Sequence, residues 1–168
     1  DLVSRPYLEM TLKLMERFGV KHHWDNNTIA IAPQTYKAAE FTVEADWSAA
    51  SYYFTIAALA KQSKLLLGGL FSQSVQGDQA IQPIMKQLGI RSFFMKNWLH
   101  LIKAQPTSQH LQYDFTQCPD LAQTIVVICA ALGIPATFNG LQTLRQKETD
   151  RIAALQTELA KVGVQFTS

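Results

Sequence analysis

The sequence predicts an α/β fold built from a repeated unit of about 72 residues. Three helix-like segments end alike, in LMERFGV, IMKQLGI and LAKVGV, and their glycines, Gly19, Gly89 and Gly163, lie 70 and 74 residues apart. Strand-like and helix-like segments alternate between these glycines, which favours a layered α/β architecture. The repeat is too long for the common solenoids and suits a βαβαββ module.

Two further matches support the repeat. Residues 67–78 align with residues 138–150, and residues 44–60 align with residues 117–133. The chain therefore contains two near-complete units, which follow the tail of an earlier unit.

The first predicted elements are a helix and a hairpin. Ser4 and Pro6 mark a helix start, and Gly19 marks its end because glycine readily adopts the left-handed cap conformation. Residues 21–32 alternate in polarity around the turn residues 25–27, which predicts a β-hairpin.

The next unit is predicted to contain four strands and two helices. FTVEA (41–45) is a strand, and residues 48–60 are apolar nearly all round, which predicts a buried helix. A strand at 64–70, an amphipathic helix at 78–88 with Pro83 near its start, and strands at 91–96 and 98–104 complete the unit.

The last unit contains an apolar helix at 121–133 and an amphipathic helix expected to begin near Gln146. The second helix carries an apolar face with spacings of 3, 4 and 3, at Ile152, Leu155, Leu159 and Val162. Extended backwards, that face passes through three charged residues, Lys147, Glu148 and Arg151. A β-branched residue after Gly163 is expected to start another strand.

These three charges have two interpretations. They can form a solvated first helical turn, with pairs worth about 0.2–0.5 kcal/mol each. They can also face a cleft, where Arg151 matches a carboxylate or phosphate, Lys147 binds an oxyanion and Glu148 moves a proton. Spacing alone leaves both open.

Other helix starts carry polar residues with similar alternatives. Asp120 is either a capping aspartate or a general base at a cleft. Ser4 is either a cap, or it binds a ligand together with Tyr7. Asp46 and Asp78 occupy corresponding helix starts and are interpreted mainly as caps. Because the helices follow strands, their N-termini should emerge on one side and favour an anionic ligand.

Composition excludes several functional classes. Charged residues make up 17% of the chain and the net charge is +2, which argues against a nucleic-acid scaffold. The apolar runs are too short to cross a bilayer. Cys118 and Cys129 form no CxxC motif and are expected to be buried, reduced thiols of a cytoplasmic protein. The histidines lack metal-site spacing, so no metal is expected.

The chain resembles the 5-enolpyruvylshikimate-3-phosphate synthase family, the 3-phosphoshikimate 1-carboxyvinyltransferases. The resemblance covers the whole chain and is most specific in the strings SRPY (4–7), PDLA (119–122) and KETDR (147–151), in this order. It implies two lobes, each an inside-out α/β barrel of three βαβαββ units, with helix N-termini facing the cleft between them.

The resemblance also implies an organisation into lobes. Residues 1–43 would end one lobe, and residues 44–168 would form units 44–115 and 116–168, the latter truncated, with a hinge near 44–46. The chain starts without Met and lacks residues that the family needs. We therefore expect a fragment that is inactive alone and able to self-associate, from a parent enzyme that is a monomer.

The implied reaction moves the enolpyruvyl group of phosphoenolpyruvate to the 5-hydroxyl of shikimate 3-phosphate and releases phosphate. It proceeds through a tetrahedral intermediate without a cofactor. It serves chorismate and aromatic amino acid biosynthesis and is the target of glyphosate.

The resemblance assigns roles to seven residues. Asp120 would accept a proton from the attacking hydroxyl, and Glu148 would lie near the carbon that gains and loses a proton. Arg151 would hold the phosphoenolpyruvate carboxylate. Shikimate 3-phosphate would contact Ser4, Tyr7, Asp120, Thr143 and Lys147, where Thr143 replaces an asparagine of the family.

Two alternatives share the fold. The related transferase that uses UDP-N-acetylglucosamine as acceptor depends on a loop cysteine and lacks KETDR, whereas Cys118 and Cys129 lie in or beside a predicted buried helix. A non-catalytic module of the same fold is the other alternative.

Overall fold

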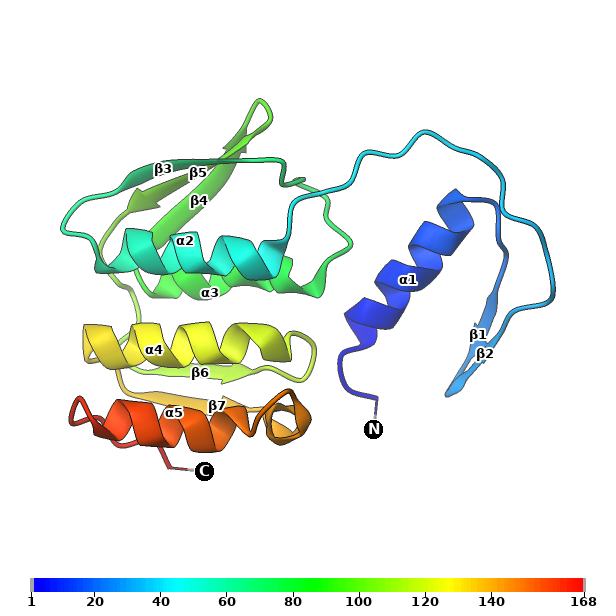
Figure 1. Cartoon of the computed structure of the whole chain (residues 1–168). Coiled ribbons are helices and arrows are strands. Elements are labelled where there is room, and N and C mark those ends of the chain that lie inside the picture. Colours follow the sequence, from blue (N-terminus) through cyan, green and yellow to red (C-terminus); the bar gives the residue numbers. More distant parts are fainter. Residues whose placement is uncertain (1, 168) are drawn as a thin grey trace.

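The computed structural model describes residues 2–167, which form a small N-terminal part and a larger α/β body (Figure 1). The N-terminal part contains helix α1 and the hairpin β1–β2. Residues 31–46 form neither helix nor strand and run in an extended path from the hairpin to the body. The chain is therefore mixed α/β, as the sequence predicts.

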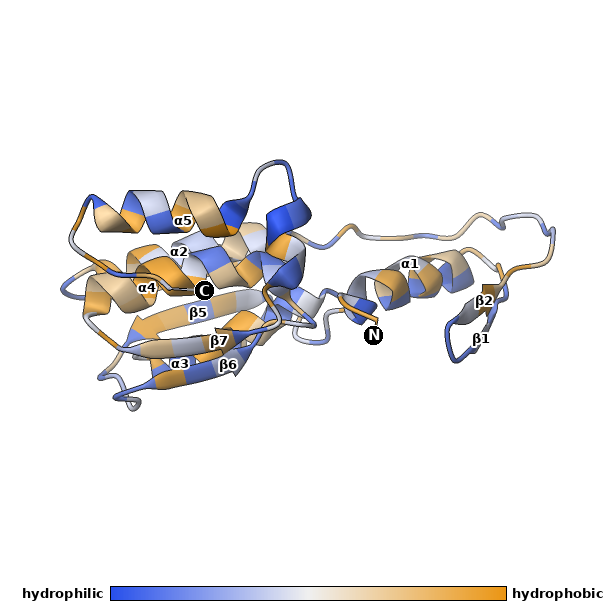
Figure 2. Cartoon of the chain, turned by 90° about the horizontal axis from the view of Figure 1, so that it is seen from below, coloured by the Kyte–Doolittle hydropathy of each residue, from blue (hydrophilic) through white to orange (hydrophobic). Residues whose placement is uncertain are grey.

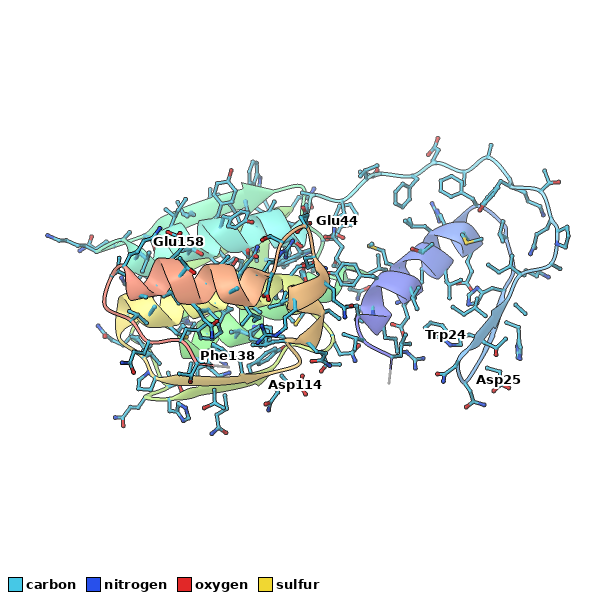
Figure 3. All side chains as sticks on the ribbon, turned by 60° about the horizontal axis from the view of Figure 1, so that its bottom comes forward. Trp24, Asp25, Glu44, Asp114, Phe138 and Glu158 are labelled. Carbon is cyan, nitrogen blue, oxygen red and sulfur yellow. The ribbon has the colours of Figure 1, made fainter. Side chains whose placement is uncertain are left out.

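The N-terminal part agrees with the prediction. Helix α1 spans Arg5–Arg17, and strands β1 (His23–Asp25) and β2 (Thr28–Ala30) pair antiparallel. The Arg5 guanidinium lies 4.5 Å from the centre of the Trp24 ring, a cation–π contact that joins the helix to the hairpin (Figure 3).

The body begins with a helix-covered antiparallel sheet. Strands β3, β5 and β4 are hydrogen-bonded in that order. The elements are α2 (Trp47–Leu59), β3 (Lys64–Gly68), the 3-10 helix η1 (Gly77–Ala80), α3 (Ile81–Gln87), β4 (Ile90–Met95) and β5 (Trp98–Lys103). These elements confirm the predicted order of the first unit from its first helix onward.

The second half of the body repeats part of this order. Strands β6 and β7 pair in parallel, which requires the crossover through α4. The elements are β6 (Leu111–Asp114), the 3-10 helix η2 (Pro119–Leu121), α4 (Ala122–Leu132), β7 (Ala136–Asn139), the 3-10 helix η3 (Gln142–Gln146) and α5 (Arg151–Ala160).

A single core joins the two halves. Trp47 and Phe54 of α2 and Ile125 and Ile128 of α4 belong to one cluster of buried side chains. Helices α2 and α4 lie side by side (Figure 1), and the hydroxyls of Ser51 and Thr124, 3.2 Å apart, satisfy each other in their contact. Helix α4 is coloured mostly apolar, whereas the turn before α5 is hydrophilic (Figure 2).

Two predicted strands are absent from the described residues. FTVEA (41–45) is extended but has no neighbouring strand, and its link to β3 is a hydrogen bond from the Ala45 N–H to the Gly69 carbonyl, 2.8 Å long. Residues 164–167 after Gly163 are likewise not a strand. A strand needs a partner for its backbone groups, so a strand-like sequence alone does not make one.

The predicted helix faces also need correction. Helix α2 is buried only on one side, because four large side chains are exposed: Tyr52, Tyr53, Ile56 and Leu59. Helix α5 begins at Arg151 rather than near Gln146. Its apolar face is confirmed at Ile152 and Leu159, whereas Val162 lies beyond the helix and is exposed.

Two glycines of the second half of the body differ in the space around them, which allows a testable prediction. Gly140 and Gly163 both have positive φ, at 73° and 79°, where alanine is strained by about 1–2 kcal/mol. A Cβ at Gly140 would also collide with the Thr116 backbone nitrogen and the Asp114 carboxylate, whereas a Cβ at Gly163 meets nothing within 4 Å. Urea unfolding should therefore show a clearly larger loss of stability for Gly140→Ala than for the matched control Gly163→Ala. Equal losses would contradict this packing.

Candidate active site

Three parts of the chain that are distant in the sequence meet at Asp120. The Asp120 Oδ1 atom lies 3.1 Å from Lys147 Nζ and 3.0 Å from Arg151 NH1, and Tyr7 donates its hydroxyl proton across 3.1 Å to Oδ2. Tyr7 comes from α1, Asp120 from η2, Lys147 from the turn after η3 and Arg151 from α5. The cluster therefore connects the N-terminal part to the body.

Asp120 is not a helix cap. Neither η2 nor α4 has a side-chain capping hydrogen bond at its N-terminus, so the capping interpretation is wrong. Burial acts to raise the pKa of Asp120, but the hydrogen bond and charge of Lys147, together with Tyr7 and Arg151, outweigh it and lower that pKa. Asp120 is therefore ionised at neutral pH.

Lys147 and Glu148 lie in a turn that precedes α5. Asp150 forms the N-cap of α5, because its carboxylate accepts hydrogen bonds from the backbone nitrogens of Ile152 and Ala153, each 3.0 Å long. Helical spacing therefore does not align Lys147 and Glu148 with Arg151, contrary to the prediction. The turn brings the three charges together.

The two interpretations of the three charges apply to different residues: Lys147 and Arg151 are largely shielded from solvent, whereas Glu148 is exposed. The Lys147 and Arg151 side chains are only 29% and 18% exposed, so they are not part of a solvated turn. Glu148 is 77% exposed and accepts a hydrogen bond of 2.8 Å from Arg151 NH2. That bond and the positive charge of Arg151 lower the pKa of Glu148.

Ser4 and Tyr7 start and orient α1. The Ser4 side chain makes no capping bond, which corrects the capping interpretation, but its backbone N–H donates to the Thr116 carbonyl across 2.8 Å. Burial, with the nearby Asp78 and Asp120, raises the pKa of Tyr7. Tyr7 thus remains a neutral phenol and a hydrogen-bond donor.

Asp78 is a site residue that the sequence did not reveal. Its side chain is only 2% exposed and contacts the Tyr7 hydroxyl and the Ser48 hydroxyl. It makes no cap for η1, so that interpretation is wrong, whereas Asp46 does cap α2 through the Ser48 backbone nitrogen at 2.8 Å. Asp46 is itself the N-cap of α2, whereas Asp78 lies inside η1, after its N-cap Gln76.

Thr143 occupies η3, away from the charged cluster's hydrogen bonds. Its Oγ1 atom is buried and has no hydrogen-bond partner among residues 2–167. An unpaired buried hydroxyl is costly, typically by about 1–3 kcal/mol. A ligand that reached this atom would remove that cost.

A cleft of about 440 Å³ separates α1 from the body. Tyr7 and Asp78 lie on its wall, and Glu44 lies where the extended segment enters the body (Figure 3). The other lining residues are Pro6, Met10, Leu14, Phe41, Val43, Asp46, Ser48, Val75, Gln76 and Gly77. The hydroxyl of Tyr7 therefore lies between this cleft and the cations around Asp120.

The described residues contain buried thiols but neither a metal-ligand cluster nor a membrane-spanning helix. Cys118 and Cys129 are buried free thiols, as predicted, and burial raises the pKa of each to about 11. Among residues 2–167, no three His, Cys, Asp or Glu side chains are grouped to hold a metal ion. No helix in that part of the chain is long and apolar enough to cross a membrane.

The sequence model of one protein family matches residues 1–168. Its description is EPSP synthase (3-phosphoshikimate 1-carboxyvinyltransferase). The chain belongs to the EPSP synthase family. This confirms the resemblance carried by SRPY, PDLA and KETDR.

Curated relatives agree with the family match. A 3-phosphoshikimate 1-carboxyvinyltransferase of Bacteroides fragilis is 46% identical over 164 residues, which are 97% of this chain and 40% of that protein. Enzymes of the same name from Cellvibrio japonicus and Methanosphaera stadtmanae are 34% and 33% identical, over 97% and 96% of the chain and 39% of each relative. The chain spans about 40% of the length of these relatives.

The ion pairs of Asp120 predict a pH-dependent stability. Because its pKa is lowered in the folded state, Asp120 stabilises the fold above its unfolded pKa, and this contribution is lost as pH falls through the folded pKa. Lys147→Gln should cost about 1 kcal/mol at neutral pH and little in acid. Lys161→Gln is a matched control, because its exposed pair with Glu158 should contribute less than about 0.5 kcal/mol. Urea unfolding at both pH values measures this, and equal effects of the two variants would contradict it.

Proposed function

We propose that this chain works within a longer enzyme that transfers the enolpyruvyl group of phosphoenolpyruvate to the 5-hydroxyl of shikimate 3-phosphate and releases phosphate. The relatives share the name of that activity. The observation that carries the proposal is the convergence of Lys147 and Arg151 on Asp120, with Tyr7 reaching the same carboxylate from α1. Two cations beside an ionised carboxylate suit two anionic substrates and a proton acceptor.

The substrates would change the environment of Asp120. Lys147 takes an anionic group of shikimate 3-phosphate, and Arg151 takes the carboxylate of phosphoenolpyruvate, for which its planar fork is suited. Both cations now lower the pKa of Asp120. When substrate anions engage them, that pKa rises, so Asp120 becomes a stronger base once the hydroxyl to be deprotonated is in place.

The chemistry then needs two more proton transfers, one to C3 of phosphoenolpyruvate and one from it. The 5-hydroxyl oxygen attacks C2 of phosphoenolpyruvate while C3 gains a proton, which gives a tetrahedral intermediate. That intermediate loses phosphate while C3 gives up a proton. We assign proton transfer at C3 in both steps to Glu148, an exposed carboxylate that accepts a hydrogen bond from Arg151. The reaction requires neither a metal nor an organic cofactor.

The same proposal covers the organisation of the chain. Residues 1–43 end one lobe and residues 44–168 belong to the other, as units 44–115 and 116–168 of the inside-out α/β barrel. The long extended segment up to residue 46 is consistent with a hinge there. The full-length protein acts in the cytoplasm as a monomer and forms no complex with nucleic acid or membrane.

Acceptor choice tests the function directly. The full-length protein should release phosphate from phosphoenolpyruvate when shikimate 3-phosphate is present, and not with UDP-N-acetylglucosamine or without acceptor. The 168-residue chain alone should show no turnover, because oriented binding can supply about 7–11 kcal/mol of a barrier. Release with UDP-N-acetylglucosamine would favour the related transferase, and release with neither acceptor would favour a non-catalytic module.

Thr143 allows binding to be separated from stability. Thr143→Val keeps the shape and removes an unpaired hydroxyl, so the free energy of unfolding should stay the same or rise slightly. If that hydroxyl binds shikimate 3-phosphate, the KM for this substrate should rise by about tenfold, the loss of one hydrogen bond. Thr137→Val, at an exposed position on β7, is the control. An unchanged KM would remove Thr143 from the site.

A further inference from the structure

The hydroxyl of Tyr7 contacts more acceptors than it can serve. It lies 3.3 Å from both oxygens of Asp78 and 3.1 Å from Asp120 Oδ2. A phenol has one proton and can donate it to one carboxylate at a time. If both aspartates were ionised, one of these contacts would join two oxygens with no proton between them, inside a partly buried site.

The surroundings of the two aspartates decide which one carries the extra proton. Asp120 is held ionised by Lys147 and Arg151. Asp78 has no lysine, arginine or histidine partner within residues 2–167. The titratable groups that face it are Tyr7, Asp46, Cys118 and Asp120.

The direction in which the pKa of Asp78 is shifted agrees with the assignment of the extra proton to this residue. Burial raises this pKa most, and Asp120 and Asp46 raise it further, against the opposing hydrogen bonds from Ser48 and Tyr7. The proton count and the environment therefore point to the same carboxyl group.

We infer that Asp78 is held in its neutral, protonated form and donates its proton to the oxygen of Tyr7, so that Tyr7 must donate to Asp120. Ser48 donates to the other oxygen of Asp78. Every donor in the series Ser48, Asp78, Tyr7 and Asp120 then has an acceptor, and the hydrogen bonds run in one direction.

The consequence is a positioning role that rests on the proposed function. Asp78 touches neither reacting group, but it fixes the hydroxyl of Tyr7, and Tyr7 in turn occupies one oxygen of Asp120. The other oxygen of Asp120 faces Lys147 and Arg151, where the substrates are proposed to bind. The same series ties α1 to the body across the cleft, so ionising Asp78 would weaken both the orientation of Tyr7 and the contact between the two parts.

The first test measures stability and needs no activity. A carboxyl group whose pKa is raised by folding stabilises the fold below its unfolded pKa, and that contribution is lost as pH rises through the folded pKa. Between the unfolded and the folded pKa of Asp78, the free energy of unfolding of the wild-type full-length protein should therefore fall as pH rises. It should fall relative to that of Asp78→Asn, whose amide is neutral at every pH. Asp25→Asn, in the exposed β1–β2 hairpin, should follow the wild-type curve. Parallel curves for the wild type and Asp78→Asn would overturn the inference.

The second test measures turnover with shikimate 3-phosphate. Asparagine can donate to Tyr7 and accept from Ser48, as a neutral aspartic acid does, so Asp78→Asn should keep kcat/KM within about threefold of wild type. Asp78→Ala, which leaves Tyr7 unoriented, should lose about 100-fold. The wild-type rate should also fall at high pH where that of Asp78→Asn persists.

The outcomes separate the two proposals. An Asp78→Asn variant as impaired as Asp78→Ala, when both fold, would show that the ionised carboxylate is required and would overturn the inference. If Asp78→Ala fails to fold, the pH profile of Asp78→Asn still decides. Stability curves that differ as expected, in a protein that releases no phosphate with shikimate 3-phosphate, would support a neutral Asp78 and refute the proposed function.

Discussion

The arrangement of the site depends on the ion pairs that the carboxylate of Asp120 forms with two cations. Lys147 and Arg151 come from the turn and helix that follow β7, and Tyr7 comes from α1, more than 100 residues earlier. No local element places these residues together. An uncompensated buried charge is costly, so the ionised Asp120 requires its cations. The cations would repel each other without it. These three charges all belong to the body, and Tyr7 adds the hydrogen bond that ties the N-terminal part to them.

Two carboxyl groups in this site have their pKa values moved in opposite directions, and one phenol joins them. Asp120 lies beside two cations and its pKa is lowered, whereas Asp78 is buried with no cationic partner among residues 2–167 and its pKa is raised. Environments that separate the pKa values of neighbouring acids are a general means of giving them different roles. Here the separation would let Asp120 accept a proton while Asp78 keeps one. Tyr7, with its own pKa raised, carries the direction of the hydrogen bonds from one acid to the other.

The sequence predicted most elements, because helices and hairpins are specified locally. The hairpin turn at Asn26 and the glycine that ends α1 are examples. Predictions failed where structure depends on distant partners. The segment 41–45 has strand composition but pairs with no strand in the described part of the chain, and α5 starts at Arg151 because Asp150 caps it there. Lys147 and Arg151 were identified from their motif, whereas Asp78 was taken for a cap, because its contact with Tyr7 joins residues 71 positions apart.

Helix α2 is more exposed than its apolar composition predicts. Its residues are apolar nearly all round, yet Tyr52, Ile56 and Leu59 are exposed. A monomeric surface rarely carries such a patch without a partner. The chain spans about 40% of the length of its relatives, and the repeat gives α2 and α4 corresponding positions in successive units. Helix α4 packs against α2 where Thr124 of α4 meets Ser51 of α2. The apolar composition of α2 thus matches its packing only on the side that contacts the core, and composition alone could not tell which side that is.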